Sequence, residues 1–369
     1  MEVQKISDTK SPAVRNSSFE LLRILCMFMI VAYHYNIHGN SSNIFQSDFS
    51  LNQLYSIIFG SWGLLGVDCF IFISAYFLVD SKRFSSKKLV KIFFQTILYS
   101  TVMAFILYAS GTVKFVPMDL YKSILAPFFN LYWFVTAYLM LYLIYPFLNK
   151  IIHSMDNRYL LKFLIILTIL VPVYKTVISE ASIGSFLFVI YLYILMGYLK
   201  NNPGNWFEKH AKSGFIWTSL AIIFFAVITS VLGTKLDSDT VQNYTDMFIK
   251  RFSPAMILDA IFLFYIFKNL KIKSSKFINN VAKTTLGIYL FHENPVLGKV
   301  LWDKILKIKT VYHSPMFLVY MFISVVALFV IGAIIDYLRI KLIEEPLFNR
   351  KIKCLDFCYS KIDAWMNND

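Results

Sequence analysis

The stretch FELLRILCMFMIVAYHYNIH, residues 19–38, is long and apolar enough to cross a lipid bilayer as one helix. It nevertheless carries Arg23 near its start and His34 near its end. The two residues are 11 positions apart, which on a helix separates them by about 20° around the axis and about 16 Å along it. One face of the predicted span therefore presents a cation and a deep imidazole. They are either a functional pair or an arginine that extends to the membrane edge and a hydrogen-bonded core histidine.

The composition of the rest of the chain agrees with a membrane protein. Of 369 residues, 57% are hydrophobic and only 16% are charged, whereas soluble domains average about 45–50% and about 25%. These values exclude a disordered chain and an ordinary soluble enzyme. The net charge of +14 indicates basic loops at the cytoplasmic membrane surface. We expect no nucleic-acid partner, because there is no basic soluble domain.

The predicted fold is an all-α, polytopic bundle of about ten spans that forms one transmembrane domain over residues 1–345. With both termini cytoplasmic, the inner segments carry 26 basic residues and the outer segments 10. Residues 346–369 are expected to form a cytoplasmic amphipathic tail. The predicted spans cover residues 18–38, 55–79, 88–109, 129–152, 160–179, 183–199, 214–232, 252–268, 281–298 and 315–338.

Ionisable residues inside spans are candidates for function, because a charge at the bilayer centre is costly. Asp68 lies in the middle of GVDCFIFISAYF, residues 66–77, and is expected to pair with a histidine or arginine of another span. The alternative is a polar contact that only holds two helices together. Asp336 is expected to be solvated near the inner surface, and Asp259 has no predicted role.

The predicted ninth span contains TTLGIYLFHENP, residues 284–295. Thr285, Tyr289, His292 and Glu293 share one side of it at helical spacing. Pro295 leaves backbone carbonyls free for a site. We expect no metal there, because no paired-ligand spacing supports one.

Two further features are less specific. Lys88 and Lys91 follow a basic cluster at the predicted cytoplasmic edge. They either serve topology alone or face a cavity and hold an anionic ligand such as a phosphate. Trp133 opens the predicted fourth span and is either part of the interfacial aromatic belt or part of a site.

Taken in order, these motifs resemble acyltransferase family 3, the integral-membrane acyltransferases that modify bacterial surface sugars. The resemblance is to stand-alone members like those of Gram-positive bacteria and extends over residues 18–350. The matching residues are Arg23 and His34 with the preceding Glu20, residues 66–68 and 73–76, Lys88, Lys91, Trp133, Tyr142, Pro146, residues 253–254 and 287–294, Glu344 and Pro346.

The resemblance implies that acetyl-CoA, or another acyl-CoA, is the donor and that no cofactor is bound permanently. Arg23, Lys88 and Lys91 would hold its phosphates. Ser74 and Tyr76 would line the path of the pantetheine arm.

The resemblance also implies the roles around the acceptor. His34 would be the general base or a transient acyl carrier, and Asp68 would orient it. His292 and Glu293 would lie on the acceptor side, with Trp133 stacking on a sugar ring.

The implied activity is O-acylation, most simply O-acetylation, of a surface polysaccharide or its lipid-linked precursor in a bacterial plasma membrane. The chain would transfer the group directly or with a separate extracytoplasmic partner. Two alternatives share the topology, namely a transporter or flippase for a polysaccharide precursor and a polysaccharide polymerase. A transporter would be expected to show inverted repeats, and a polymerase a large outer loop.

Overall fold

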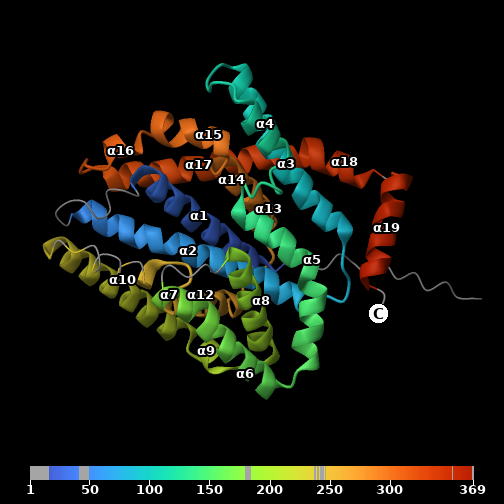
Figure 1. Ribbon diagram of the computed structural model, residues 1–369, viewed down its shortest axis with the longest axis horizontal. Coiled ribbons are helices and arrows are strands. Elements are labelled where there is room, and N and C mark those ends of the chain that lie inside the picture. Colours follow the sequence, from blue (N-terminus) through green and yellow to red (C-terminus); the bar gives the residue numbers. More distant parts are fainter. Residues whose placement is uncertain are drawn as a thin grey trace, which may run out of the picture.

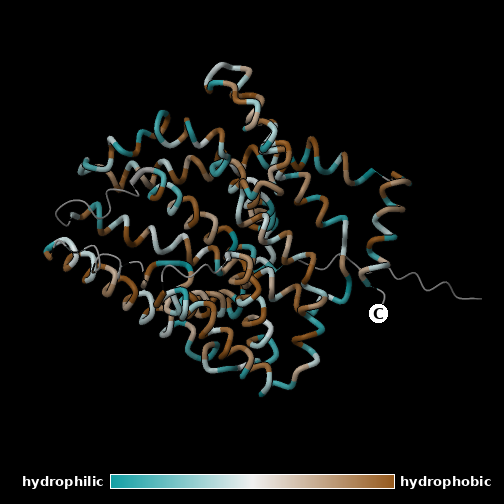
Figure 2. Tube along the Cα trace, viewed as in Figure 1, coloured by the Kyte–Doolittle hydropathy of each residue, from teal (hydrophilic) through white to brown (hydrophobic). Residues whose placement is uncertain are grey.

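A computed structural model describes residues 16–40, 50–178, 184–236, 247–350 and 352–367, together with residues 238, 241 and 245. Parts of the predicted segments 1–23, 39–54, 175–182, 233–251 and 346–369 lie outside these residues. Within the described part every element is helical, and Figure 2 shows long apolar stretches along most of the helices.

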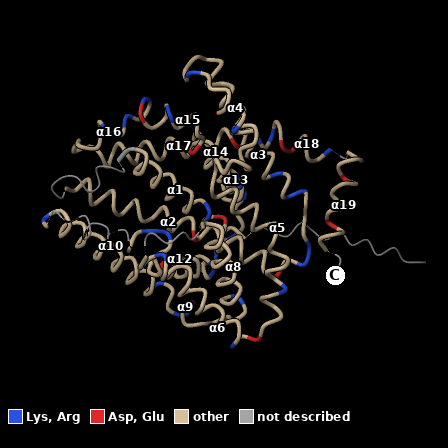
Figure 3. The backbone as a smooth tube through the Cα atoms, in the orientation of Figure 1, with Lys and Arg blue, Asp and Glu red and all other residues tan. Residues whose placement is uncertain are grey.

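The long helices follow the apolar runs of the sequence. Charged residues are sparse along most of their length (Figure 3), as expected for segments surrounded by lipid. The helices of the first half are α1 (Ser17–Asn40), α2 (Leu51–Leu78), α3 (Ser86–Ala109), α4 (Pro117–Ile124), α5 (Trp133–Ser154), α6 (Asn157–Thr168), α7 (Tyr174–Val177) and α8 (Ser185–Asn201). Those of the second half are α9 (Trp206–Lys209), α10 (Ala211–Lys235), α12 (Pro254–Lys268), α13 (Lys276–Lys283), α14 (Thr285–His292), α15 (Pro295–Val300), α16 (Ile308–Val311), α17 (Phe317–Arg339), α18 (Glu345–Asn349) and α19 (Lys353–Asn367).

Seven described segments are long and apolar enough to cross a membrane, so the chain is a multi-pass helical protein. Two of them continue through π-helical turns, Ile169–Val173 and Ile340–Glu344. The predicted spans 183–199 and 252–268 form the shorter helices α8 and α12. The count of ten spans and the cytoplasmic termini stay predictions.

The predicted span 281–298 is not one continuous helix. It is divided among α13, α14 and α15. The break before α15 follows from Asn294 and Pro295: proline cannot donate a backbone hydrogen bond, and the Asn294 side chain accepts from the backbone N–H groups of Val296 and Leu297 at 3.0 Å. The resulting cap starts α15 in a new direction.

Helices α1 and α2 form the central pair, with α17 and α14 on one side and α12, α10 and α8 on the other (Figure 1). Their close approach requires glycine, because a Cβ on Gly66 would lie 2.8 Å from the carbonyl oxygen of Cys26. The contact fixes the register of the two helices.

Two buried carboxylates hold outer helices to this centre. Asp336 of α17 is fully buried, so its predicted solvation was wrong. It accepts hydrogen bonds from Tyr99 and Gln95 of α3 and from Arg339, which together satisfy a buried charge. Asp259 of α12 accepts hydrogen bonds from Thr218 and Ser219 of α10, so its role is to join two helices.

Candidate functional site

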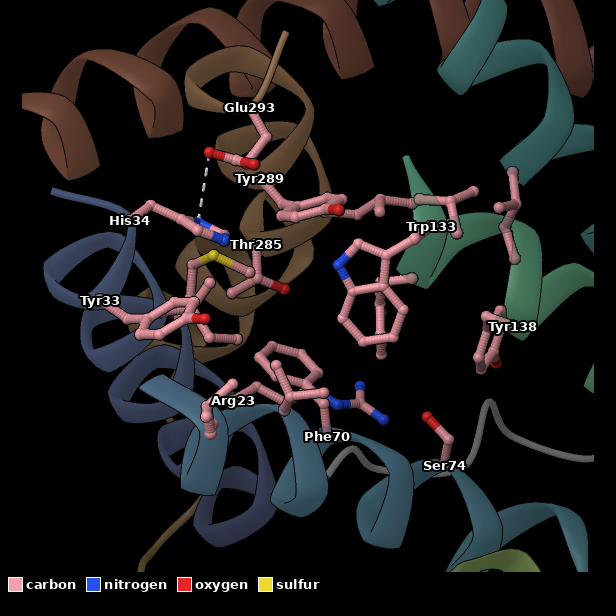
Figure 4. Close-up of a pocket in the computed structure, with 18 of the residues that line it drawn as sticks. Arg23, Tyr33, His34, Phe70, Ser74, Trp133, Tyr138, Thr285, Tyr289 and Glu293 are labelled. Atoms are coloured by element: carbon pink, nitrogen blue, oxygen red, sulfur yellow. Dashed lines mark ion pairs between the residues drawn. The ribbon is translucent and has the colours of Figure 1, made fainter. Parts of the chain in front are cut away.

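A large cavity lies among α1, α2, α3, α5 and α14 and has a volume of about 1750 Å³. Arg23 and His34 both line it, as the spacing on one helix face predicts. Figure 4 shows His34 beside Glu293 and, on the other side of the view, Ser74 and Tyr138. One helix therefore presents a cation and an imidazole to the same cavity.

Glu293 reaches the cavity because α14 ends just before it. His292 is the last residue of α14, and Glu293 caps its C-terminus. The turn before Pro295 then aims the Glu293 carboxylate at α1. Glu293 Oε1 lies 2.7 Å from His38 Nε2 and 3.6 Å from His34 Nδ1.

His34 and His292 are in direct contact. His34 Nδ1 lies 2.9 Å from His292 Nε2, and His292 Nδ1 lies 2.6 Å from the carbonyl oxygen of Ile288. His292 is fully buried and His34 nearly so. The polar residues of α1 and of the α14 end thus form one connected group, called here the histidine cluster: His34, His38, His292 and Glu293.

The histidine cluster is also the place where described side chains could hold a metal ion. One ligand atom each from His34, His292 and Glu293 lies within 4.8 Å of the others. The expectation from the sequence was that no metal binds there.

A second group of cavity residues is cationic. Arg23, Lys88 and Lys91 line the cavity together with Arg339. Arg23 pairs with Glu20 at 3.3 Å, and Lys91 pairs with Glu344 at 3.3 Å. Arg23 and Lys91 remain partly exposed in these pairs, so an entering phosphate can reach both cations.

Between the two groups the wall is aromatic. Trp133, Phe134, Tyr138 and Tyr289 line it, and the hydroxyl of Ser74 also borders the cavity. The guanidinium of Arg251 lies 4.1 Å from the centre of the Trp133 ring. Such stacking is typical of arginine, which is only weakly hydrated.

Three of the predicted site residues do not line this cavity. His292 contacts His34 instead. The ring of Tyr76 packs among Phe19, Phe77 and Phe264, under the ammonium of Lys200 at 4.3 Å.

Asp68 is the third, and it lies away from His34. Its helix meets α1 at Cys26 through Gly66, about 12 Å below His34 by the rise of the helix. Asp68 is fully buried, and neither carboxylate oxygen has a hydrogen-bond partner within the described residues. Arg251 is the cation whose charge acts on Asp68, but no ion pair joins the two within the described residues, so a partner for Asp68 stays a prediction.

Arg251 and Arg339 were not identified from the sequence as site residues. Arg251 lies at the end of a polar segment, three residues before the Pro254 that opens α12, where a basic residue fits a loop equally well. Arg339 is the last residue of α17 and is equally well explained by topology. The usable signal was the pair of carboxylates in apolar runs, Asp68 and Asp336, because a nearby cation lowers the cost of burying a carboxylate.

The fold and the site define a polytopic helical membrane protein with a large cavity between its spans, lined by both charged and aromatic residues. A family model for an acyltransferase domain matches residues 16–336. The chain therefore belongs to acyltransferase family 3, which confirms the family that the motifs indicated. Comparisons with curated proteins and with solved structures give no match.

Proposed function

We propose that this membrane acyltransferase moves an acyl group, most simply acetyl, from acyl-CoA to a sugar hydroxyl of a bacterial surface polysaccharide or its lipid-linked precursor. We place it in the plasma membrane, as for stand-alone members of Gram-positive bacteria. The observation that carries the proposal is that the cationic group and His34 line the same cavity. A long donor with phosphates at one end and a thioester at the other fits that separation.

The donor would enter at the cationic end. Arg23, Lys88 and Lys91 would hold the phosphates of CoA, because charge-assisted hydrogen bonds to phosphate are strong. The pantetheine arm would pass Ser74 and Tyr138. The thioester would then lie beside His34.

The chemistry requires a base, a protected thioester and a hydroxyl. His34 Nε2 takes the hydroxyl proton as the sugar oxygen forms a bond to the thioester carbon. The carbon–sulfur bond then breaks, and the CoA thiolate takes the proton from the His34 imidazolium. Glu293, 3.6 Å from Nδ1, stabilises the imidazolium between these steps. The aromatic wall formed by Trp133, Phe134, Tyr138 and Tyr289 would limit hydrolysis of the thioester by water.

The acceptor would come from the other end of α1. A second cavity of about 220 Å³ borders His38, Glu293, Lys299, Trp302 and Asp303. His38 is 15 positions from Arg23, about 22 Å along the helix. Glu293 borders both cavities, which supports opposite entrances for donor and acceptor. A sugar that passes this entrance can stack on Trp133 only if Arg251 gives way.

The test is transfer from labelled acetyl-CoA in membranes of a strain that carries the gene and of its deletion strain. We expect label in the glycan fraction of the first strain only, with release of the label by mild alkali, as for an ester. The absence of label there, together with movement of lipid-linked sugar across the membrane, would instead favour a transporter. Glycan chains that lengthen without label would favour a polymerase.

A further inference from the structure

The contact between His34 and His292 determines where the protons of both rings lie. A carbonyl oxygen can only accept a hydrogen bond, so His292 Nδ1, 2.6 Å from Ile288 O, must carry a hydrogen. A neutral imidazole has one such hydrogen. Nε2 of His292 therefore holds a lone pair and can only accept.

The same reasoning then applies to His34. Its Nδ1 lies 2.9 Å from the lone pair of His292 Nε2, so Nδ1 must be the donor and carry the hydrogen. The lone pair of neutral His34 consequently lies on Nε2. Within the described residues no protein group is hydrogen-bonded to Nε2, while His34 lines the large cavity.

We propose that His292 is a positioning residue that holds His34 in the Nδ1–H tautomer and directs its basic Nε2 at the substrates. This inference rests on the proposed function, in which His34 is the base. His292 is fully buried and does not line the cavity, so it acts through His34. A backbone carbonyl sets the tautomer of His292, and His292 sets that of His34. The carbonyl oxygen of Ile288 in α14 thus determines which nitrogen of each ring carries the hydrogen.

Glu293 stabilises His34 without taking the Nδ1 hydrogen bond from His292. Its Oε1 accepts a hydrogen bond from His38 Nε2 at 2.7 Å and lies 3.6 Å from His34 Nδ1, beyond hydrogen-bond length. The carboxylate therefore stabilises a positive charge on His34 and leaves the Nδ1 hydrogen to His292. His38 in turn stacks on Trp302 with ring centres 4.9 Å apart, which holds Glu293 in place.

The distance between His34 Nδ1 and His292 Nε2 favours a hydrogen bond between the two rings over a metal ion that both rings bind. Two nitrogens at ordinary zinc distances in a tetrahedral site lie about 3.3 Å apart, whereas these lie 2.9 Å apart. The latter value is usual for a nitrogen–nitrogen hydrogen bond.

Two variants of His292 test the proposal. The amide oxygen of Gln reaches about as far as Nε2 and accepts a hydrogen bond, whereas Leu has a similar volume and cannot. We expect His292→Leu to lower kcat about 10–100-fold, the usual cost of removing an orienting partner, with the KM for acetyl-CoA unchanged. His292→Gln should recover most of the rate. Equal rates for both variants would overturn the proposal.

A spectroscopic measurement tests the tautomer without relying on activity. In protein labelled with nitrogen-15 histidine and reconstituted in lipid, the signals of His34 are assigned by their loss in His34→Gln. We expect a protonated Nδ1 and an unprotonated Nε2 in the wild type, and a changed proton distribution in His292→Leu. A protonated Nε2 in the wild type, or one zinc ion per chain in the purified protein, would overturn the proposal.

These outcomes separate the inference from the proposed function. A wild-type protein with the expected tautomer but without acyl transfer would contradict the function and leave the proton order standing. An active wild-type protein with protonated Nε2 would contradict the inference alone.

Discussion

Arg23 and His34 become candidates for function because of where they lie in the fold. Both lie on α1, and either alone has an ordinary structural explanation. The cavity joins them to Lys88, Lys91 and Glu293, residues that are distant in the sequence. Because they share this cavity, the two residues can act on the same bound substrate.

The role of Arg23 in donor binding can be tested with two donors. We expect Arg23→Ala to raise the KM for acetyl-CoA about tenfold or more, because a hydrogen bond to a charged group contributes about 1.5–3 kcal/mol. S-acetyl-pantetheine has no nucleotide phosphates, so its KM should not change. Steady-state kinetics in membranes measure both values.

A matched control for this prediction is Arg158→Ala, at the exposed start of α6. It should leave both KM values unchanged. If Arg23→Ala raised the KM of the two donors equally, its effect would not come from the phosphates.

How well the sequence predicted a site residue depends on why that residue was chosen. Arg23, His34 and Glu293 were costly polar groups in apolar helices, and the cavity contains all three. Tyr76 was chosen by resemblance alone, and it packs in an aromatic cluster. The position of Arg251 could not be expected, because it comes from the segment before α12, where a basic residue fits a loop equally well.

At the scale of helices, the apolar runs predicted most elements to within a few residues. The break in the run 281–298 was not predicted, although Pro295 was noted. Hydrophobicity averages over many residues, whereas the break depends on a single cap by Asn294 and on a missing backbone donor at Pro295. This break between α14 and α15 places Glu293 at the site.

The pairing of α1 with α2 depends on glycine at the crossing. We expect Gly66→Val to lower the free energy of unfolding by about 1–3 kcal/mol, since the side chain would overlap the α1 backbone. Gly60→Val on the same helix should have a smaller effect, because a Cβ there meets no atom within 4 Å.

Thermal unfolding of the two variants in detergent, followed by tryptophan fluorescence, measures the difference. Both variants add the same side chain to α2 and carry the same loss of glycine. Equal midpoints would show that the close approach of α1 and α2 does not limit stability.

For the whole molecule, the predicted topology can be tested with the native cysteines. Cys26 and Cys69 are buried, while Cys354 and Cys358 are exposed on α19. If the C-terminal helix is cytoplasmic, a membrane-impermeant maleimide should label the protein only after the cells are permeabilised. Mass spectrometry of the labelled peptides identifies the cysteines.

The double variant Cys354→Ser with Cys358→Ser should remain unlabelled in both conditions. Labelling of Cys354 or Cys358 in intact cells would place the C-terminus outside and invert the proposed directions of donor and acceptor. The exposed sulfur atoms of α19 thus report on the orientation of the whole bundle.

If His34 activates the acceptor hydroxyl, the rate of acyl transfer must collapse in His34→Ala. The measurement is alkali-labile label transferred from acetyl-CoA to glycan per folded protein, with the exposed His313→Ala as control. We expect kcat to fall about 10²–10⁴-fold in His34→Ala, the usual contribution of a general base, and to stay unchanged in His313→Ala. Transfer by His34→Ala at the wild-type rate would contradict this role of His34.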